Sequence, residues 1–258
     1  MSTLTCYRLN EHLYQINEKA GMTLNVDSYL VIGEKRAAVI DALQETEALY
    51  DLVRMLTKKP LFLLLTHGHP DHAGKSVRSF VEHQVPVFMN HPDLDDLKLS
   101  HNEDLCEDIQ DLHDGDCFDL GGMNLETIAC PGHSKGSMVF LNRKYQELYS
   151  GDAIGSGSFW IQLPESLPLH EYLNHAEHLF FQVKNMKELR IYPGHRYQSV
   201  EQLNLQYLND NICLTQRLIA GRIKGEKEGT MHFLKQNIHY AIASYGMVKE
   251  YWYDPAKL

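Results

Sequence analysis

The most constraining feature of the chain is a short cluster of polar residues that directly follows an apolar run. His67, His69, Asp71 and His72 fall within six positions, straight after residues 61–66, which read Leu-Phe-Leu-Leu-Leu-Thr. This run predicts a buried strand, because it is short, apolar and preceded by a proline. Side chains at the end of a rigid strand can be held in a fixed arrangement. Imidazole and carboxylate groups held in this way favour a divalent metal site over a solvated histidine-rich loop.

Three further candidate ligands each follow a predicted strand. His133 stands in a Pro-Gly turn after residues 123–129, Asp152 closes a short apolar run, and His195 repeats the pattern of strand, Pro-Gly turn and histidine. Taken singly, each histidine fits an ordinary turn and Asp152 fits a helix cap. With the first cluster they make seven ligands, too many for one tetrahedral ion and suited to two ions that share a carboxylate.

In their order and spacing, these seven residues resemble the ligand set of the metallo-β-lactamase superfamily of hydrolases. The resemblance implies an α/β fold, an αββα sandwich in which two mixed sheets are flanked by helices and the site lies at one edge of the sheets. It also implies that the first metal is held by His67, His69 and His133, the second by Asp71, His72 and His195, and that the bridge between them is Asp152.

Within the superfamily, the sequence is most similar to the glyoxalase II-like and lactone-hydrolysing branches. Class B β-lactamases usually lack an aspartate equivalent to Asp152, and their principal subclass uses a cysteine ligand, whereas none of the five cysteines here occupies a motif position. Flavodiiron proteins carry Glu where His69 stands, and persulfide dioxygenases use a single iron site. The C-terminal region shows no counterpart of the glutathione-binding segment of glyoxalase II, so the substrate stays open.

The paired site predicts a dinuclear metal-dependent hydrolase that attacks a small ester or thioester carbonyl with metal-bound hydroxide. Two divalent ions are the expected cofactors, zinc in the first place and iron or manganese as alternatives. Asp71 and Asp152 are the expected catalytic carboxylates. Two other interpretations stay open, a lactonase of the same fold and a metal-binding sensor without useful turnover. A serine hydrolase is not expected, because Ser134 and Ser137 lie in no GxSxG elbow.

Charge and composition restrict the partners. The formal net charge is −10, and a nucleic-acid partner is not expected because phosphate contacts need a basic surface. The first residues show no basic-then-apolar signal pattern, and no apolar run approaches membrane-spanning length. The five cysteines are scattered without a CxxC pair, which is typical of reduced packing residues, and Cys130 is given no catalytic role. We therefore expect a cytoplasmic enzyme with a small-molecule substrate and no membrane partner; a homodimer stays open.

A hydrophobic content of 43% over 258 residues allows one layered domain, residues 1–258, with residues 199–258 as a C-terminal helix-plus-strand extension. Residue patterns predict strands at 13–16, 28–32, 37–40 and 85–89, and helices at 46–58, near 170–184 and at 199–224. The last helix is expected to be capped by Ser199, with Gln202 at the capping-box position. The aromatic segment 240–253 predicts strands, a lid or a dimer contact, with no choice among them.

Aromatic and histidine residues beyond Asp152 are further candidates. Phe159 and Trp160 follow Asp152 closely, and we expect them either to line a substrate pocket or to belong to the core. His175 and His178 stand at helical spacing, which favours a helix surface or a packed position over additional metal ligands.

Overall fold

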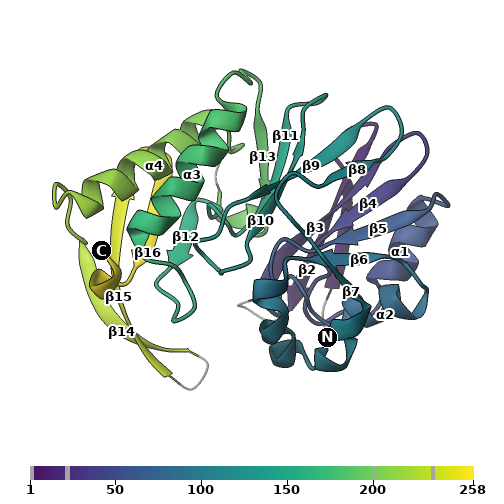
Figure 1. Ribbon diagram of the computed structural model, residues 1–258, viewed down its shortest axis with the longest axis horizontal. Coiled ribbons are helices and arrows are strands. Elements are labelled where there is room, and N and C mark those ends of the chain that lie inside the picture. The colour runs from purple at the N-terminus through teal and green to yellow at the C-terminus, as the bar shows by residue number, and fades with distance from the viewer. Residues whose placement is uncertain (1–2, 21–23, 200, 234–235) are drawn as a thin grey trace.

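Three mixed β-sheets and four α-helices make up the fold (Figure 1), in a computed structural model that describes residues 3–20, 24–199, 201–233 and 236–258. The first sheet has seven strands in sequence order. Its first four strands pair antiparallel, and the remaining pairs are parallel. The strands are β1 (Thr3–Arg8), β2 (Leu13–Ala20), β3 (Leu24–Ile32), β4 (Ala37–Ile40), β5 (Leu61–Leu64), β6 (Val87–Met89) and β7 (Ile109–Asp111).

Two further sheets follow along the chain. The second has five strands in the order β13-β11-β10-β9-β8, and the third has four in the order β12-β16-β15-β14. The second sheet contains β8 (Cys117–Asp119), β9 (Asn124–Ala129), β10 (Met138–Asn142), β11 (Glu147–Gly151) and β13 (Arg190–Pro193). The third contains β12 (Ser158–Ile161), β14 (Lys227–Phe233), β15 (Gln236–Tyr245) and β16 (Val248–Tyr253).

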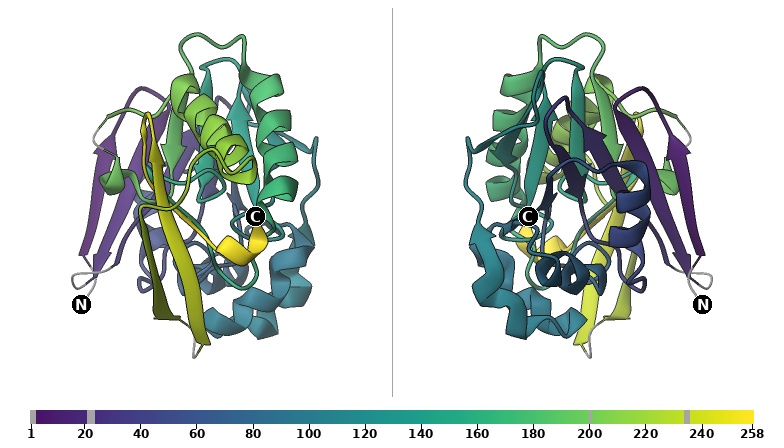
Figure 2. Two further views of the ribbon diagram at one scale, coloured as in Figure 1. Left: turned by 90° about the vertical axis from the view of Figure 1, so that its left-hand side faces the viewer. Right: turned by 90° about the vertical axis from the view of Figure 1, so that its right-hand side faces the viewer.

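Helices cover the outer faces of the sheets (Figures 1 and 2). The helices α1 (Leu49–Leu56) and α2 (Ser76–Glu82) pack on the first sheet, whereas α3 (Leu169–Val183) and α4 (Leu205–Ile219) pack on the second and third. The predicted αββα architecture is confirmed, and the third sheet adds to the two that were expected. Among the described residues, no helix has both the length and the apolar character needed to cross a membrane.

The middle strands β4 and β5 of the first sheet are buried on both faces, and this explains their apolar sequence. Successive side chains of a strand point to opposite faces. In β4, Ala38 and Ile40 therefore face the second sheet, where they pack with residues such as Phe140. Ala37 and Val39 face α1 and α2 on the other side. Strands with this continuous apolar pattern were predicted most accurately from the sequence. For β4, the predicted and observed bounds are the same.

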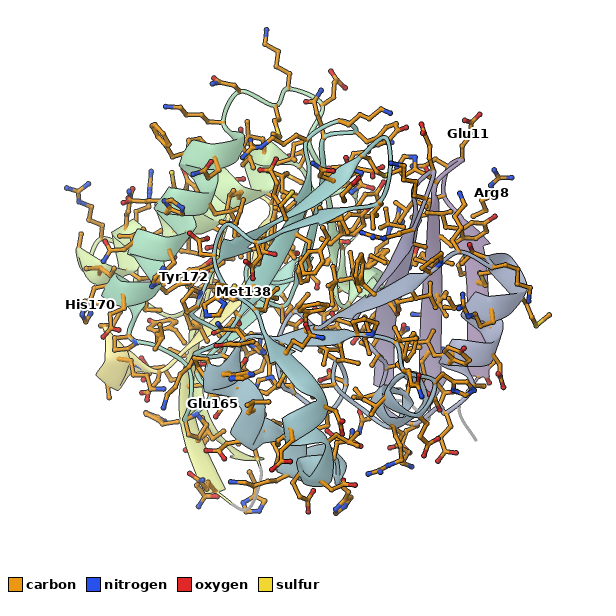
Figure 3. The ribbon with its side chains drawn as sticks, turned by 45° about the vertical axis from the view of Figure 1, so that its right-hand side comes forward. Arg8, Glu11, Met138, Glu165, His170 and Tyr172 are labelled. Carbon is orange, nitrogen blue, oxygen red and sulfur yellow. The ribbon has the colours of Figure 1, made fainter. Side chains whose placement is uncertain are left out.

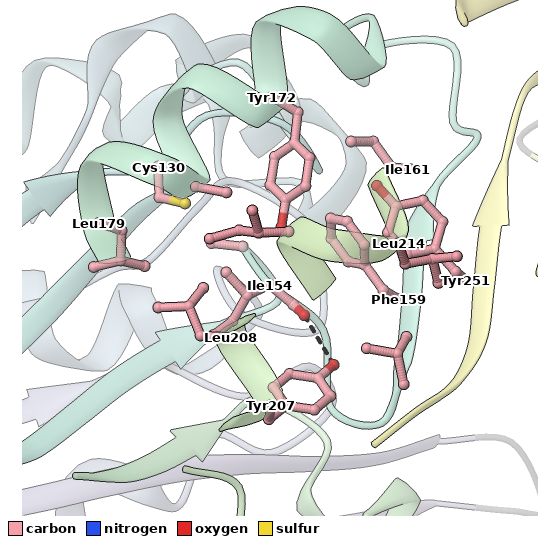
Figure 4. Packing of buried hydrophobic residues seen from close by; sticks show 14 of the residues in the cluster. Cys130, Ile154, Phe159, Ile161, Tyr172, Leu179, Tyr207, Leu208, Leu214 and Tyr251 are labelled. Carbon is pink, nitrogen blue, oxygen red and sulfur yellow. Dashed lines mark hydrogen bonds between the residues drawn. The ribbon is translucent and has the colours of Figure 1, made fainter. Parts of the chain in front are cut away.

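The core on the other side of the second sheet is rich in aromatic residues (Figure 4). Tyr172 and Leu179 lie on the buried stripe of α3, whose buried positions recur every three to four residues. Phe159 is fully buried, with its ring centroid 5.0 Å from that of Tyr172. Tyr207 of α4 donates a 2.9 Å hydrogen bond to the carbonyl oxygen of Ile154 (Figure 4), which ties this helix to the loop after Asp152.

One helix begins later than predicted. The expected helix 199–224 is shorter and runs over Leu205–Ile219; Val200, inside the expected range, lies outside the described residues. Its N-cap is Asn204, whose side chain accepts hydrogen bonds from the backbone amides of Gln206 and Tyr207. The predicted cap was wrong because the Ser199 hydroxyl donates instead to the Arg196 carbonyl oxygen, within a preceding 3₁₀ turn.

Candidate metal centre

The seven predicted ligands lie together at one edge of the two large sheets. His67 and His69 follow β5, Asp152 follows β11, and His195 follows β13. In the first sheet β4, β5 and β6 are parallel, and in the second sheet β11 and β13 are parallel. Polar side chains that follow neighbouring parallel strands emerge at the same sheet edge, so strands far apart in sequence deliver their side chains to one place.

Two of the three ligand groups match the sets predicted for separate ions. The groups are His67, His69 and His133; Asp71, His72 and His195; and His67, His72 and Asp152. Within each group, one nitrogen or carboxylate oxygen per residue lies within 4.8 Å of the others. The closest approach among these histidines joins His133 Nε2 to His69 Nδ1, at 2.9 Å.

Asp152 lies between the two predicted sets, as a bridging carboxylate must. Its Oδ2 is 3.8 Å from His133 Nε2 in the first set and 3.2 Å from His195 Nε2 in the second. Its Oδ1 is 3.6 Å from His72 Nε2. Within the second set, Asp71 Oδ2 lies 3.3 Å from His195 Nε2.

Three buried polar atoms of this cluster fit a metal better than they fit the protein. Within the described residues, His67 Nε2, His72 Nε2 and Asp152 Oδ1 have no hydrogen-bond partner, although all three are buried. An unpaired buried polar atom costs on the order of 1–3 kcal/mol. A cation coordinated by these atoms would remove that cost, so the donor set fits divalent metal.

The other ring nitrogen of each histidine has a partner that fixes the orientation of the ring. His133 Nδ1 lies 2.6 Å from the Trp160 carbonyl oxygen, and His195 Nδ1 lies 2.9 Å from the Asn25 carbonyl oxygen. His67 Nδ1 is 3.0 Å from the Thr66 hydroxyl. Such partners set the tautomer and direct the free nitrogen toward the metal.

Asp41 holds His72 and was not predicted from the sequence. Its Oδ2 lies 2.7 Å from His72 Nδ1 and also accepts a 2.9 Å bond from the Thr66 hydroxyl, while Oδ1 accepts a 2.8 Å bond from the Thr66 amide. Asp41 adopts φ 65°, a left-handed conformation that aspartate tolerates better than most residues. A usable signal exists, because Asp41 directly follows the buried strand β4, and the histidine cluster likewise comes soon after the end of β5.

Glu165 is a second residue that sequence reasoning missed. Its Oε1 lies 3.1 Å from His69 Nε2. The carboxylate of Glu165 is thus the partner of His69 Nε2, and His69 Nδ1 is the nitrogen that points to the proposed first metal. Glu165 lies in the segment between β12 and α3 (Figure 3). That segment has no periodic pattern, and nothing in the sequence relates position 165 to position 69.

Gly194 leaves room for the ligands. A Cβ atom at this position would overlap the His72 ring and lie 2.7 Å from Asp152 Oδ1. The Pro-Gly turn before His195 therefore has a steric reason, because any side chain at 194 would displace two proposed ligands.

Burial and charge set the protonation of the histidines. Burial lowers the pKa of His133 to about 4 and also lowers that of His67, which keeps their lone pairs available. Burial opposes a charge on His72 as well. The neighbouring Asp71, Asp41 and Asp152 outweigh this effect and raise the pKa of His72 to about 9. Binding of a metal in place of these protons is therefore accompanied by proton release.

Other candidate residues lie outside the centre. His170 projects from the start of α3 with 63% of its side chain exposed (Figure 3), and His175 and His178 lie further along the same helix. The Ser134 hydroxyl donates to Asp93 and is buried, so it does not face a substrate. Cys130 is fully buried, and burial raises its pKa to about 12.

A cavity of about 370 Å³ opens onto the centre. Trp160 lines it, whereas Phe159 faces the core, so the two aromatic residues have different roles. The residues that line this cavity are Gln44, His69, Pro70, Asp71, Leu99, His133, Asp152, Gly155, Ser158, Trp160, Leu163, His195, Tyr197, Gln198 and Phe233.

Comparison with known proteins places this fold and site in a family. Residues 21–195 match the metallo-beta-lactamase superfamily. The chain belongs to this superfamily. Among solved structures, a metallo-beta-lactamase from Pontibacter korlensis is similar with a TM-score of 0.62 and 18% identity, covering 83% of this chain and 99% of that one.

Curated superfamily relatives are hydrolases by name. A probable polyketide biosynthesis zinc-dependent hydrolase, BaeB of Bacillus velezensis, is 23% identical and covers 86% of this chain and 99% of its own length. The acyl-coenzyme A thioesterase MBLAC2 of Homo sapiens is 26% identical, over 76% of this chain and 83% of the relative. The hydroxyacylglutathione hydrolase GloC of Haemophilus influenzae is 28% identical, over 48% and 64%. Family and relatives confirm the predicted class, a metal-dependent hydrolase.

Proposed function

We propose that this superfamily member is a dinuclear hydrolase that cleaves a small thioester or ester. The observation that carries the proposal is the pair of ligand groups joined by Asp152, with unpaired buried atoms directed between them. In this proposal the first ion is held by His67, His69 and His133, the second by Asp71, His72 and His195, and Asp152 is shared. Zinc is the proposed metal because it suits histidine and carboxylate ligands and because one relative is named zinc-dependent.

The ions would activate water near neutral pH and stabilise negative charge on a carbonyl oxygen. Hydrolysis joins the oxygen of water to the acyl carbon, breaks the bond from that carbon to sulfur or oxygen, and transfers a proton to the leaving group. Asp71 and Asp152 have 27% and 16% of their side chains exposed and both line the cavity. We assign them the role of catalytic carboxylates that orient the attacking water and take up its proton.

Thioesters are the first substrate class to test. The human relative is named for acyl-coenzyme A and the H. influenzae relative for acylated glutathione, and both names describe acyl groups on sulfur. Lactones are the comparison class, because the same ligand arrangement suits an internal ester. The five cysteines of the structure are unpaired, which supports a reducing compartment such as the cytoplasm.

The test combines metal content with turnover. Protein purified without chelator should contain about two transition-metal ions per chain. It should cleave a thioester, measured as a decrease in thioester absorbance, and addition of a chelator should stop this cleavage. His69→Ala should lose metal and activity together. The matched control is His170→Ala, which removes an exposed histidine of α3 and should behave as the unmodified protein.

Each element of the proposal can fail separately. A single ion per chain, with Asp71 and His195 free of metal in a crystal structure, would refute the dinuclear assignment. Cleavage of lactones alone would assign the protein to the lactonase alternative. Two bound ions without turnover of thioesters, esters or lactones would assign it to the sensor alternative.

A further inference from the structure

The third sheet has one face that packs on helices and one that bears aromatic side chains, of which Trp160 and Phe233 line the cavity. Phe159 and Tyr251 lie on the first face, in the helix-covered core (Figure 4). Trp160 pairs in register with Trp252, so these two side chains lie on the opposite face. Their ring centroids are 5.6 Å apart, and Tyr240 adds a third ring 4.6 Å from Trp252.

Phe233 extends this surface at the end of β14. Its ring centroid is 6.5 Å from that of Trp160, and both residues line the cavity. Figures 1 and 2 show the β14–β15 pair reaching the same end of the molecule as the 3₁₀ segment His91–Ser100. That segment contributes Leu99, which also lines the cavity and is 41% exposed. We call Trp160, Phe233, Tyr240 and Trp252 the aromatic wall.

Among the described residues that line the cavity, the carboxylates and imidazoles all belong to the proposed metal centre. None of these described lining residues is a lysine or arginine. The other lining residues are apolar or neutral, such as Leu99, Leu163 and Gln198. Lys257, near Leu163, donates its hydrogen bonds to three backbone carbonyl oxygens. Among the described residues that line it, the cavity thus offers apolar area beside the proposed metal centre and no cationic side chain for a charged acyl group.

We infer that the acyl group of the substrate is apolar, an unbranched aliphatic or aromatic chain, and that it packs against Trp160 and Phe233. This inference rests on the proposed thioester hydrolysis. The acyl carbon lies at the metal centre, the chain runs along the aromatic wall, and the thiol carrier leaves through the open mouth. Hydrolysis then releases an apolar carboxylic acid and the free thiol of the carrier, with water as the only co-reactant.

Tryptophan fluorescence tests the wall without turnover. The chain has two tryptophans, and both belong to the wall. The variant Trp252→Phe keeps an aromatic ring at that position and makes Trp160 the sole tryptophan. This variant, stripped of metal, is titrated with the thioether S-octyl-N-acetylcysteamine, which cannot be hydrolysed. The octyl thioether should shift the Trp160 emission until the signal saturates. The S-methyl analogue should cause no such shift at the same concentrations. Equal response to both thioethers, or none to either, would overturn the inference.

Chain-length selectivity tests the wall in turnover. For acyl thioesters of N-acetylcysteamine from acetyl to octanoyl, kcat/KM should rise roughly fourfold per methylene until the wall is covered. Phe233→Ala should lower the ratio of octanoyl to acetyl kcat/KM about tenfold. Phe181→Ala, which removes a phenylalanine that is 65% exposed on α3, is the matched control and should keep the full preference.

The outcomes separate the inference from the function beneath it. Thioester hydrolysis at equal rates for all chain lengths, or a preference for short hydroxylated acyl groups, would overturn the apolar assignment and leave the proposed hydrolase intact. Failure of every thioester despite bound metal would remove the proposed function, and the Trp160 titration would then decide whether the cavity still binds apolar chains.

Discussion

Replacement of Asp41 by asparagine gives a sharp test of how the second metal set is built. Asp41 is 2% exposed and accepts hydrogen bonds from the amide and hydroxyl of Thr66 and from His72 Nδ1. With its proton on Nδ1, His72 keeps a free lone pair on Nε2, which lies 3.6 Å from Asp152 and 3.8 Å from Asp71. The carboxylate thus selects the tautomer that can bind metal.

Asp41→Asn preserves shape and tolerance of the left-handed backbone but changes a double acceptor into an acceptor and a donor. The new carbonyl oxygen of the asparagine can still accept from the Thr66 amide. The new NH₂ group then faces His72 Nδ1, which carries a hydrogen in the unmodified protein, so that two donors face each other. His72 must then move its proton to Nε2 or lose its partner. Either change should weaken binding of the second ion about 10- to 100-fold, the usual cost of losing such a support. Loss of a charged hydrogen bond should also lower the free energy of unfolding by about 2 kcal/mol.

The assay is competition between the protein and a chromophoric chelator, which gives the affinity of each ion, together with chemical denaturation. Asp210→Asn is the matched control, because Asp210 is also a buried carboxylate that accepts hydrogen bonds, from Gln206 and Met247, away from the proposed ligands. We expect it to keep both ions. Unchanged affinity for the second ion in Asp41→Asn would show that Asp41 supports the fold and does not select the His72 tautomer.

Two other predictions concern the proposed ligands and their support, and a third concerns the cysteines. Asp152→Asn removes the charge proposed to lie between two cations, so kinetics and elemental analysis should show turnover lower by on the order of 10²-fold and less bound metal; two ions with full turnover would contradict the bridge. Glu165→Ala removes the partner of His69 Nε2 and should weaken first-ion binding about tenfold in the chelator assay, with the second ion unaffected. Because burial raises the pKa of Cys130 to about 12, its thiol stays protonated at lower pH, and mass spectrometry should find native protein alkylated at exposed Cys6 and not at Cys130 at pH 8.

That the proposed ligands lie at a sheet edge could be predicted from the sequence because local order determines it. Each follows a strand or stands in the adjoining turn, and a strand end places the next side chains at the sheet edge. The positions of His67, Asp152 and His195 could be predicted without knowing which strands are neighbours. Their grouping in space depends on the order of the strands in the sheets, and the family resemblance supplied that grouping.

Support for the ligands was harder to predict, because it depends on distant contacts. Asp41 and Glu165 contact histidines that lie 31 and 96 positions away in the chain. Asp41 at least follows a strand. The helix start at Leu205 was missed for a similar reason: Ser199 and Asn204 are both good caps, and the choice depends on the antiparallel bridge between Leu203 and Ile191, which holds the chain extended up to the helix.

The proposed ligands and most of the proposed aromatic wall lie in different parts of the chain. All seven proposed ligands lie between positions 67 and 195, inside the segment that matches the superfamily. Three of the four strands of the third sheet, β14, β15 and β16, begin after position 195 and contribute no proposed ligand. The parallel pairing of β12 with β16 brings Trp160, eight positions after Asp152, into one surface with residues from the end of the chain. We therefore expect that changes in β14–β16 can reshape the proposed wall while every proposed ligand keeps its strand, so that substrate preference can change independently of the proposed metal centre.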